Sequence, residues 1–217
     1  ASRPADATPG EWRTLAAAHA AAMRHAVALW PHDAALWRLA SQSSLAEAAA
    51  AVGTLDDGGA AAAGALAESA ALRAVALEPE RAQSFFSLGD ALAARALRTR
   101  GTDVADSAAA AYQRAEALAP VDGWLLVAHA RYQLARRDGV RALEIAQRII
   151  GLYPEAAVGH TLSGAALMLL HRPGEARDEL LRARAARWEE DAGPQRAAVE
   201  RLLETMGPAS TAALDTL

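Results

Sequence analysis

The stretch that decides the fold is residues 116–170, EALAPVDGWLLVAHARYQLARRDGVRALEIAQRIIGLYPEAAVGHTLSGAALMLL. Pro120 and Pro154 each close a short apolar run, "ALAP" and "GLYP", and each is followed by a new apolar segment. The two prolines are 34 residues apart. Proline cannot continue a helical hydrogen-bond ladder, so each one marks the end of a helix. The spacing therefore predicts a unit of two helices that recurs along the chain.

Two more prolines stand in the same setting, Pro31 in "VALWP" and Pro79 in "VALEP". The intervals from Pro31 onwards are 48, 41 and 34 residues. Small or apolar residues stand five positions before the four prolines: Ala26, Ala74, Ala115 and Ile149. The Gly- and Asp-containing stretches 51–60 and 97–106 predict loops between paired helices, which would account for the two longer intervals.

The segments "SFFSLGDAL" (84–92) and "SAAAAYQRAEALAP" (107–120) carry the clearest pattern of small and bulky positions. They resemble the tetratricopeptide repeat family, whose 34-residue helix–turn–helix units stack on one another. The positions that match are Phe85, Leu88, Gly89, Leu92, Ala108, Tyr112, Ala115 and Pro120. The resemblance implies an all-α, right-handed superhelical solenoid of antiparallel helix pairs. An irregular helical bundle is the alternative.

On this pattern we expect ten helices, ending in a cap helix that is apolar on one face. Their predicted ranges are 11–30, 33–51, 59–78, 81–98, 103–119, 122–137, 139–153, 155–171, 173–188 and 193–206. The predicted units are 11–31, 32–79, 80–120, 121–154 and 155–188, with the cap at 193–206, a linker-like lead-in at 1–10 and a flexible tail at 207–217. Asp122, and either Thr102 or Asp103, are expected to cap helices. Pro173 fits a first helical turn.

Composition agrees with tightly packed small-residue helices. Of the 217 residues, 53% are hydrophobic, many of them Ala, and only 5% are aromatic. The net charge of −4 offers no general attraction to nucleic acid. The chain has no Cys, which excludes disulfides and thiolate metal sites. No unbroken apolar run reaches about 18 residues, so we expect no membrane-spanning segment.

A search for catalytic motifs finds no Gly-rich phosphate loop, no HExxH and no GxSxG. No two of the six His have the i, i+4 spacing of a helical metal site. His129 and His160 could approach each other across neighbouring units, but packed histidines are the favoured interpretation. We therefore expect no enzyme activity, no cofactor and no metal.

The resemblance implies that first helices of successive units line a concave groove that binds a protein or peptide. Carried over position by position, the groove residues are Arg38, Gln42, Gln83, Phe86, Asp90, Trp124, Val127, Arg131, Val158, Thr161 and Met168. Phe86 and Trp124 are the expected anchors, although both could instead belong to the core. Arg38 and Arg131 could hold a carboxylate or phosphate. The Lys/Asn clamp of the chaperone-binding branch is absent, since the chain has neither residue type.

A weaker resemblance, over residues 30–185, is to the soluble C-terminal tails of O-antigen ligase-like membrane proteins. It is carried by "SLGDALAARALRTRGTDVADSAAAAYQRAEALAP" (87–120) after a Pro-rich lead-in. It implies an appendage with an interaction or regulatory role beside a glycan-transfer protein. The compartment stays open on the sequence: bacterial cytoplasm, or a tail on either side of a membrane. The cap helix favours a monomer.

Overall fold

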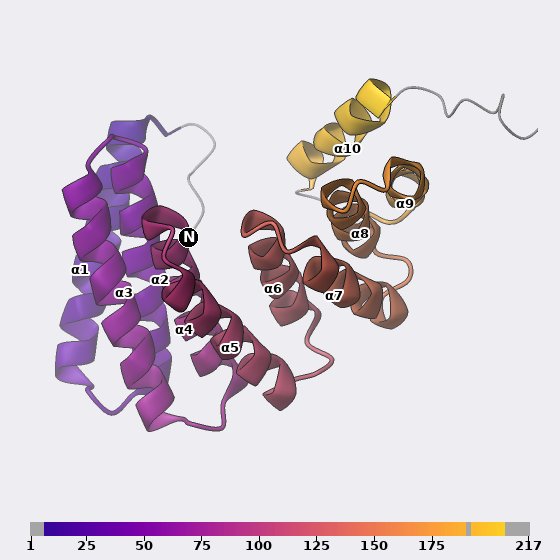
Figure 1. Cartoon of the computed structure of the whole chain (residues 1–217). Helices are drawn as coiled ribbons and strands as arrows, with labels where there is room; N and C mark the ends of the chain where they lie inside the picture. Colours follow the sequence, from indigo (N-terminus) through magenta and orange to yellow (C-terminus); the bar gives the residue numbers. More distant parts are fainter. Residues whose placement is uncertain (1–6, 190–191, 207–217) are drawn as a thin grey trace, which may run out of the picture. The chain divides into compact units, whose positions relative to one another are not determined.

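The structure is a computed structural model, and it describes residues 7–189 and 192–206. The described chain is all-helical, and it divides after Pro120 into two compact units, α1–α5 and α6–α10 (Figure 1). The helices are α1 Pro9–Leu29, α2 Ala34–Val52, α3 Asp57–Leu77, α4 Ala82–Thr99, α5 Thr102–Leu118, α6 Gly123–Ala135, α7 Gly139–Leu152, α8 Ala157–Leu169, α9 Pro173–Ala185 and α10 Gly193–Met206. The prediction of ten helices is confirmed for these residues, and the cap helix has its predicted bounds.

The helix ends have clear local causes. Each of the four prolines that set the repeat stands two residues beyond a helix end, after α1, α3, α5 and α7. Aspartates begin several helices, and Asp122 accepts hydrogen bonds from the backbone N–H of Trp124 (3.1 Å) and Leu125 (3.3 Å), as predicted. Pro173 stands in the first turn of α9, also as predicted.

Unit 1 is built from Ala-rich helices that pack in chain order. The pairs α2–α3 and α4–α5 make the most extensive contacts, and α2 also contacts α4. Every buried residue of α3 is Ala, and Ala67, Ala71 and Ala74 are fully buried. Because Ala side chains are short, the helix backbones can approach closely. The core therefore consists of many small contacts, among them a cluster formed by Ala67, Ala71 and Ala91 with Leu45 and Leu88.

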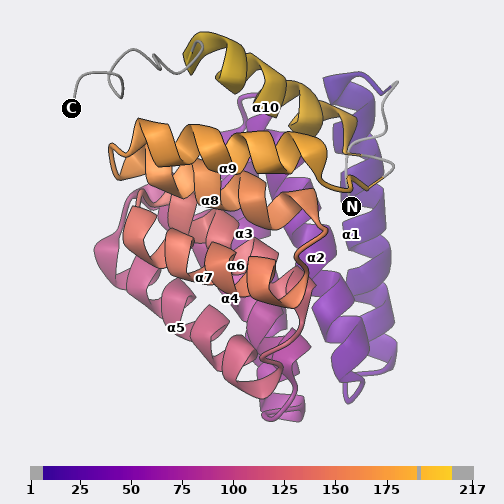
Figure 2. The same cartoon turned by 90° about the vertical axis from the view of Figure 1, so that its right-hand side faces the viewer.

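Unit 2 repeats the arrangement with shorter helices and larger side chains. In Figure 2, α8 and α9 lie against each other and α10 lies over α9. Helix α6 packs against α7 and also contacts α8. Its main core cluster is formed by Leu126, Ala130, Ile145, Ala146, Ile149 and Leu162. Helix α10 covers the end of the unit by packing Val199 and Leu203 against Leu180.

Two glycines allow paired helices to cross closely. A Cβ atom added at Gly89 of α4 would lie 2.9 Å from Tyr112 Cδ1 of α5. A Cβ atom added at Gly164 of α8 would lie 2.8 Å from both Cγ and Cδ2 of Leu180 of α9. Both distances are shorter than carbon–carbon contact allows, so any side chain at either position would push the helices apart.

The explanation of the longer proline intervals by loops is wrong. Only Gly53–Asp56 separate α2 from α3, and only Arg100 and Gly101 separate α4 from α5. The extra residues lengthen the helices instead: α2 and α3 have 19 and 21 residues, whereas α6 and α7 have 13 and 14. Ala-rich segments extend helices readily. The turns need only one left-handed residue each, Leu55 (φ 59°) and Arg100 (φ 55°).

Three smaller expectations also need correction or fall outside the described residues. Helix α5 has Gly101 at its N-cap, and Thr102 and Asp103 lie inside the helix, so neither is the cap. Part of the expected lead-in is helical, because Thr8 caps α1 in a capping box with Glu11. Residues 1–6 and the expected tail 207–217 lie outside the described residues.

One helix in the described part of the chain, α3, is long and apolar enough to cross a membrane by length and composition. The helix meets this criterion although it contains no long unbroken apolar run, because isolated charges such as Glu68 interrupt a run without making the whole helix polar. In unit 1, α3 packs against both α2 and α4. Glu68 accepts hydrogen bonds from Arg95 of α4 at 2.7 and 3.0 Å. Here α3 is thus a packed helix of the unit.

Candidate functional site

Three of the five groove residues predicted in unit 1 make contacts within the unit. Arg38 forms an ion pair with Glu78. Phe86 is buried and packs edge-on against Tyr112, with ring centroids 6.1 Å apart. Its burial fits a core residue better than a surface anchor, which was the alternative considered for it. Gln42 and Gln83 are the two that are exposed.

Asp90, the fifth of these residues, is held at the crossing of α4 and α5. The Tyr112 hydroxyl donates a hydrogen bond to Asp90 Oδ1 at 2.6 Å. Burial raises the pKa of the Asp90 carboxyl to about 6, because a buried carboxylate loses hydration, while the bond from Tyr112 opposes the rise. Asp90 therefore affects the stability of unit 1 in a pH-dependent way.

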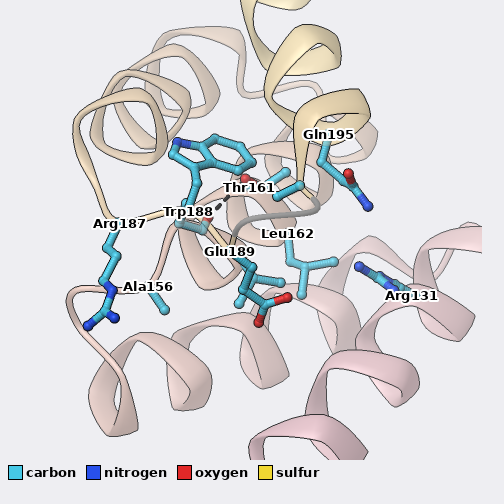
Figure 3. A pocket seen from close by; sticks show the side chains of 11 residues that line it. Arg131, Ala156, Thr161, Leu162, Arg187, Trp188, Glu189 and Gln195 are labelled. Carbon is cyan, nitrogen blue, oxygen red and sulfur yellow. Dashed lines mark hydrogen bonds between the residues drawn. The ribbon is translucent and has the colours of Figure 1, made fainter.

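In unit 2, three of the six predicted groove residues come together. Arg131 of α6 and Val158 and Thr161 of α8 line one hollow of about 170 Å³ (Figure 3). We call it the main hollow; it is lined by Arg131, Ala156, Ala157, Val158, Thr161, Leu162, Arg187, Trp188, Glu189, Ala192 and Gln195.

The other three predicted residues of unit 2 do not line this hollow. Trp124 is 70% exposed near the start of α6. Val127 is partly buried against the core cluster around Leu126. Met168 is 38% exposed near the end of α8. None of the three lines a described cavity together with Arg131.

The residues missed by the sequence analysis come from the segment that follows α9. Trp188 stands where the repeat pattern would place a proline, and it was not among the predicted groove residues. Its indole packs against the cluster of Leu180, Val199 and Leu203, and in Figure 3 the ring forms one wall of the main hollow. The indole Nε1 is buried and has no hydrogen-bond partner among the described residues.

A short parallel bridge fixes this wall. The Arg187 N–H donates to Glu155 O at 2.8 Å, and the Ala157 N–H donates to Arg187 O at 3.0 Å. The bridge ties the segment after α9 to the start of α8. It thereby holds Trp188 and Glu189 at the hollow that Thr161 also lines.

A second hollow of about 440 Å³ adjoins the first. It is lined by Tyr153, Pro154, Glu155, Ala156, Arg187, Trp188 and Glu189, and we call it the side hollow. Ala156 and residues 187–189 line both hollows. We call the two adjoining hollows together the α8 groove.

The charged side chains of the α8 groove are not committed to partners. Arg131, Arg187 and Glu189 make no side-chain hydrogen bond or ion pair with any described residue. Arg131 and Arg187 point from opposite sides of the main hollow in Figure 3, and Glu189 lies between them. The main hollow thus offers two cations and one anion around an apolar floor, and Glu155 adds a second acidic residue at the side hollow.

The two histidines singled out on the sequence have separate partners. His129 is fully buried, and its Nε2 lies 2.7 Å from Gln133 Nε2 on the same helix. His160 Nδ1 lies 2.7 Å from Glu179 Oε2 of α9, and Glu179 also pairs with Arg182. Among the described residues, no group of three or more His, Asp or Glu is placed to hold a metal ion. Glu190 and Asp191, which follow Glu189 in the sequence, lie outside the described residues.

Comparison with known proteins leaves the family open. No protein-family model matches the chain, and no curated protein matches it significantly. The two resemblances drawn from the sequence therefore remain predictions.

Proposed function

We propose that this protein is a non-catalytic scaffold that binds an extended peptide segment of another protein in the α8 groove. One observation carries the proposal. Arg131, Val158 and Thr161 were assigned to a groove from their repeat positions, and they line one hollow from the neighbouring helices α6 and α8. That hollow also contains Trp188, and Trp and Arg are the residues that most often dominate binding energy at interfaces.

The packing of helices supports a repeat architecture for the scaffold. Successive helices pair, close crossings fall at glycines, and first helices contact each other within each unit, α2 with α4 and α6 with α8. Contacts between the first helices of neighbouring pairs are what stacked repeats require. We propose that the pairs form a right-handed solenoid of the tetratricopeptide type.

The chemistry of the groove also favours binding over catalysis. Its polar side chains are Arg, Glu, Gln and Thr, and Tyr153 at the side hollow donates its hydroxyl to Val121 O at 2.6 Å. Neither hollow is lined by a histidine among the described residues. A catalytic site would need a nucleophile or base held by a hydrogen-bonded partner. An apolar hollow with a few polar groups at its edge is the usual form of a binding site.

Selection from a random peptide library on the immobilised full chain tests this function. The blocking variant is Thr161→Phe, because Thr161 lines the main hollow and its hydroxyl bonds only to Ala157 O of its own helix (2.9 Å). The matched control is Thr205→Phe on α10, where the hydroxyl also bonds within its helix.

We expect selected peptides to bind the wild type and Thr205→Phe alike, and to bind Thr161→Phe about tenfold or more weakly. Circular dichroism checks that both variants keep their helices. If no peptide is enriched over the bare surface, the proposed function is wrong. If Thr161→Phe binds normally, the groove assignment is wrong.

A further inference from the structure

The main hollow has the size and surface for one apolar side chain. Its volume is about 170 Å³, and an apolar protein cavity of about 150 Å³ accepts a benzene molecule. Val158, Leu162 and the Trp188 ring supply apolar walls, with three alanines between them. A Leu, Ile or Phe side chain would fill this space without displacing a described hydrogen bond.

Arg131 adds a charge requirement at one end of the same hollow. Its guanidinium points from α6 toward Leu162 (Figure 3), and it has no partner among the described residues. The Gln195 amide lies on the same side of the hollow. An arginine with free donors binds a carboxylate through paired, charge-assisted hydrogen bonds. The Arg131 end of the hollow therefore favours an anionic group of a ligand.

Glu189 restricts where such an anion can lie. Its carboxylate borders the hollow between Arg131 and Arg187, so it repels an acidic group placed at the centre. The favourable position for an anion is then the Arg131 end, next to the apolar side chain. This arrangement selects a short pattern of residues and not merely a net charge.

We propose that the α8 groove recognises an internal peptide segment in which a Leu-, Ile- or Phe-sized side chain enters the main hollow and a neighbouring Asp or Glu pairs with Arg131. This inference rests on the proposed function and names its ligand class. We infer an internal segment because the side hollow adjoins the main hollow: Ala156 and residues 187–189 line both. A peptide chain can continue past Trp188, whereas a site for a chain end would be closed.

Titration of the ¹⁵N-labelled full chain with capped decapeptides tests the proposal. The probes are Gly-Ser-Gly-Ser-Leu-Asp-Ser-Gly-Ser-Gly, the same peptide with Asp before Leu, and versions with Asn or Lys in place of Asp. The indole N–H signal of Trp188 reports binding at the groove, and the signal of Trp12 in α1 reports any effect outside it. The method detects millimolar binding, so weak affinity does not hide the result.

We expect one of the two Asp peptides, with either Leu-Asp or Asp-Leu, to bind about 10-fold to 100-fold more tightly than its Asn version. Arg131→Glu should remove that preference and favour the Lys version. Arg201→Glu makes the same charge change at an exposed position of α10 and should leave the preference intact.

Three results overturn the proposal: equal binding of the Asp and Asn peptides, no shift of the Trp188 signal with either Asp peptide, or tighter binding of a peptide that ends in Ser-Leu with a free carboxylate. The first and third leave the proposed function standing, because peptides still bind the groove. For the second result, the library selection shows whether the proposed function also fails, because it tests whether the chain binds any peptide.

Discussion

Replacing Asp90 by Asn should change how the stability of unit 1 depends on pH. Burial raises the pKa of Asp90 from 3.8 to about 6 in the folded chain. The folded state therefore holds this proton more tightly than the unfolded state, and its stability falls as pH rises from about 4 to about 6. A difference of about two pKa units corresponds to about 3 kcal/mol in the free energy of unfolding, and this contribution is fully lost above pH 6. Asp90 keeps part of its surface in water, so we expect the measured loss to be smaller.

The Asn variant keeps an oxygen that can accept the Tyr112 hydrogen bond but carries no charge. We expect it to be more stable than the wild type at pH 7, by about 1–3 kcal/mol, and to show a flatter profile between pH 4 and 6. Urea unfolding followed by circular dichroism at several pH values measures both effects. Asp178→Asn, at an exposed position of α9, is the control and should follow the wild-type profile. Parallel profiles for Asp90→Asn and wild type would refute burial as the cause of the raised pKa.

Three further predictions concern stability and use the same unfolding assay. Gly164→Ala should reduce the stability by about 1–3 kcal/mol, because its Cβ atom would lie 2.8 Å from Leu180. The control Gly151→Ala meets no atom within 4 Å and should stabilise α7 slightly. Equal effects of the two substitutions would mean that the crossing does not depend on the glycine. Leu55→Gly should stabilise the chain by about 0.5–1 kcal/mol, since Leu55 holds φ at 59° and its side chain is 93% exposed. A loss of stability would show that the Leu55 side chain has an unrecognised contact. Asp122→Ala should cost about 1 kcal/mol by removing the cap of α6, and an unchanged midpoint would contradict the cap.

The helices could be predicted from the sequence because their signals are local. Proline cannot continue a helix beyond its first turn, so Pro120 and Pro154 fixed two boundaries without reference to any other segment. The close crossings at Gly89 and Gly164 were also predictable, since the repeat pattern places small residues where paired helices meet. The places of the turns were predicted too, within residues 51–60 and 97–106, but their conformation was not: Leu55 and Arg100 are ordinary residues, and nothing in their identity predicts a left-handed conformation.

The site was only partly predictable because it joins segments from different helix pairs within unit 2. Arg131, Val158 and Thr161 were found by position in the repeat pattern. Trp188 was not, because its place in the hollow depends on the bridge between Arg187 and the residues around Ala156. A tryptophan in place of the expected proline was the one available signal.

Both units have ion pairs that join neighbouring helices, such as Arg184 of α9 with Glu200 of α10 in unit 2. In unit 1, ion pairs join different helices: Arg24 of α1 with Glu47 of α2, and Arg95 of α4 with Glu68 of α3.

In unit 2, several pairs lie within a single helix or turn, as with Arg141 and Glu144, and Arg131 has no described partner at all. An exposed ion pair stabilises a fold by only about 0–1 kcal/mol, so leaving an arginine unpaired costs the fold little. The same arginine can contribute much more when a ligand carboxylate removes it from water and bonds to it. A surface that binds acidic peptides should therefore combine a stable apolar floor with uncommitted cations, and in the described chain the main hollow of unit 2 has both.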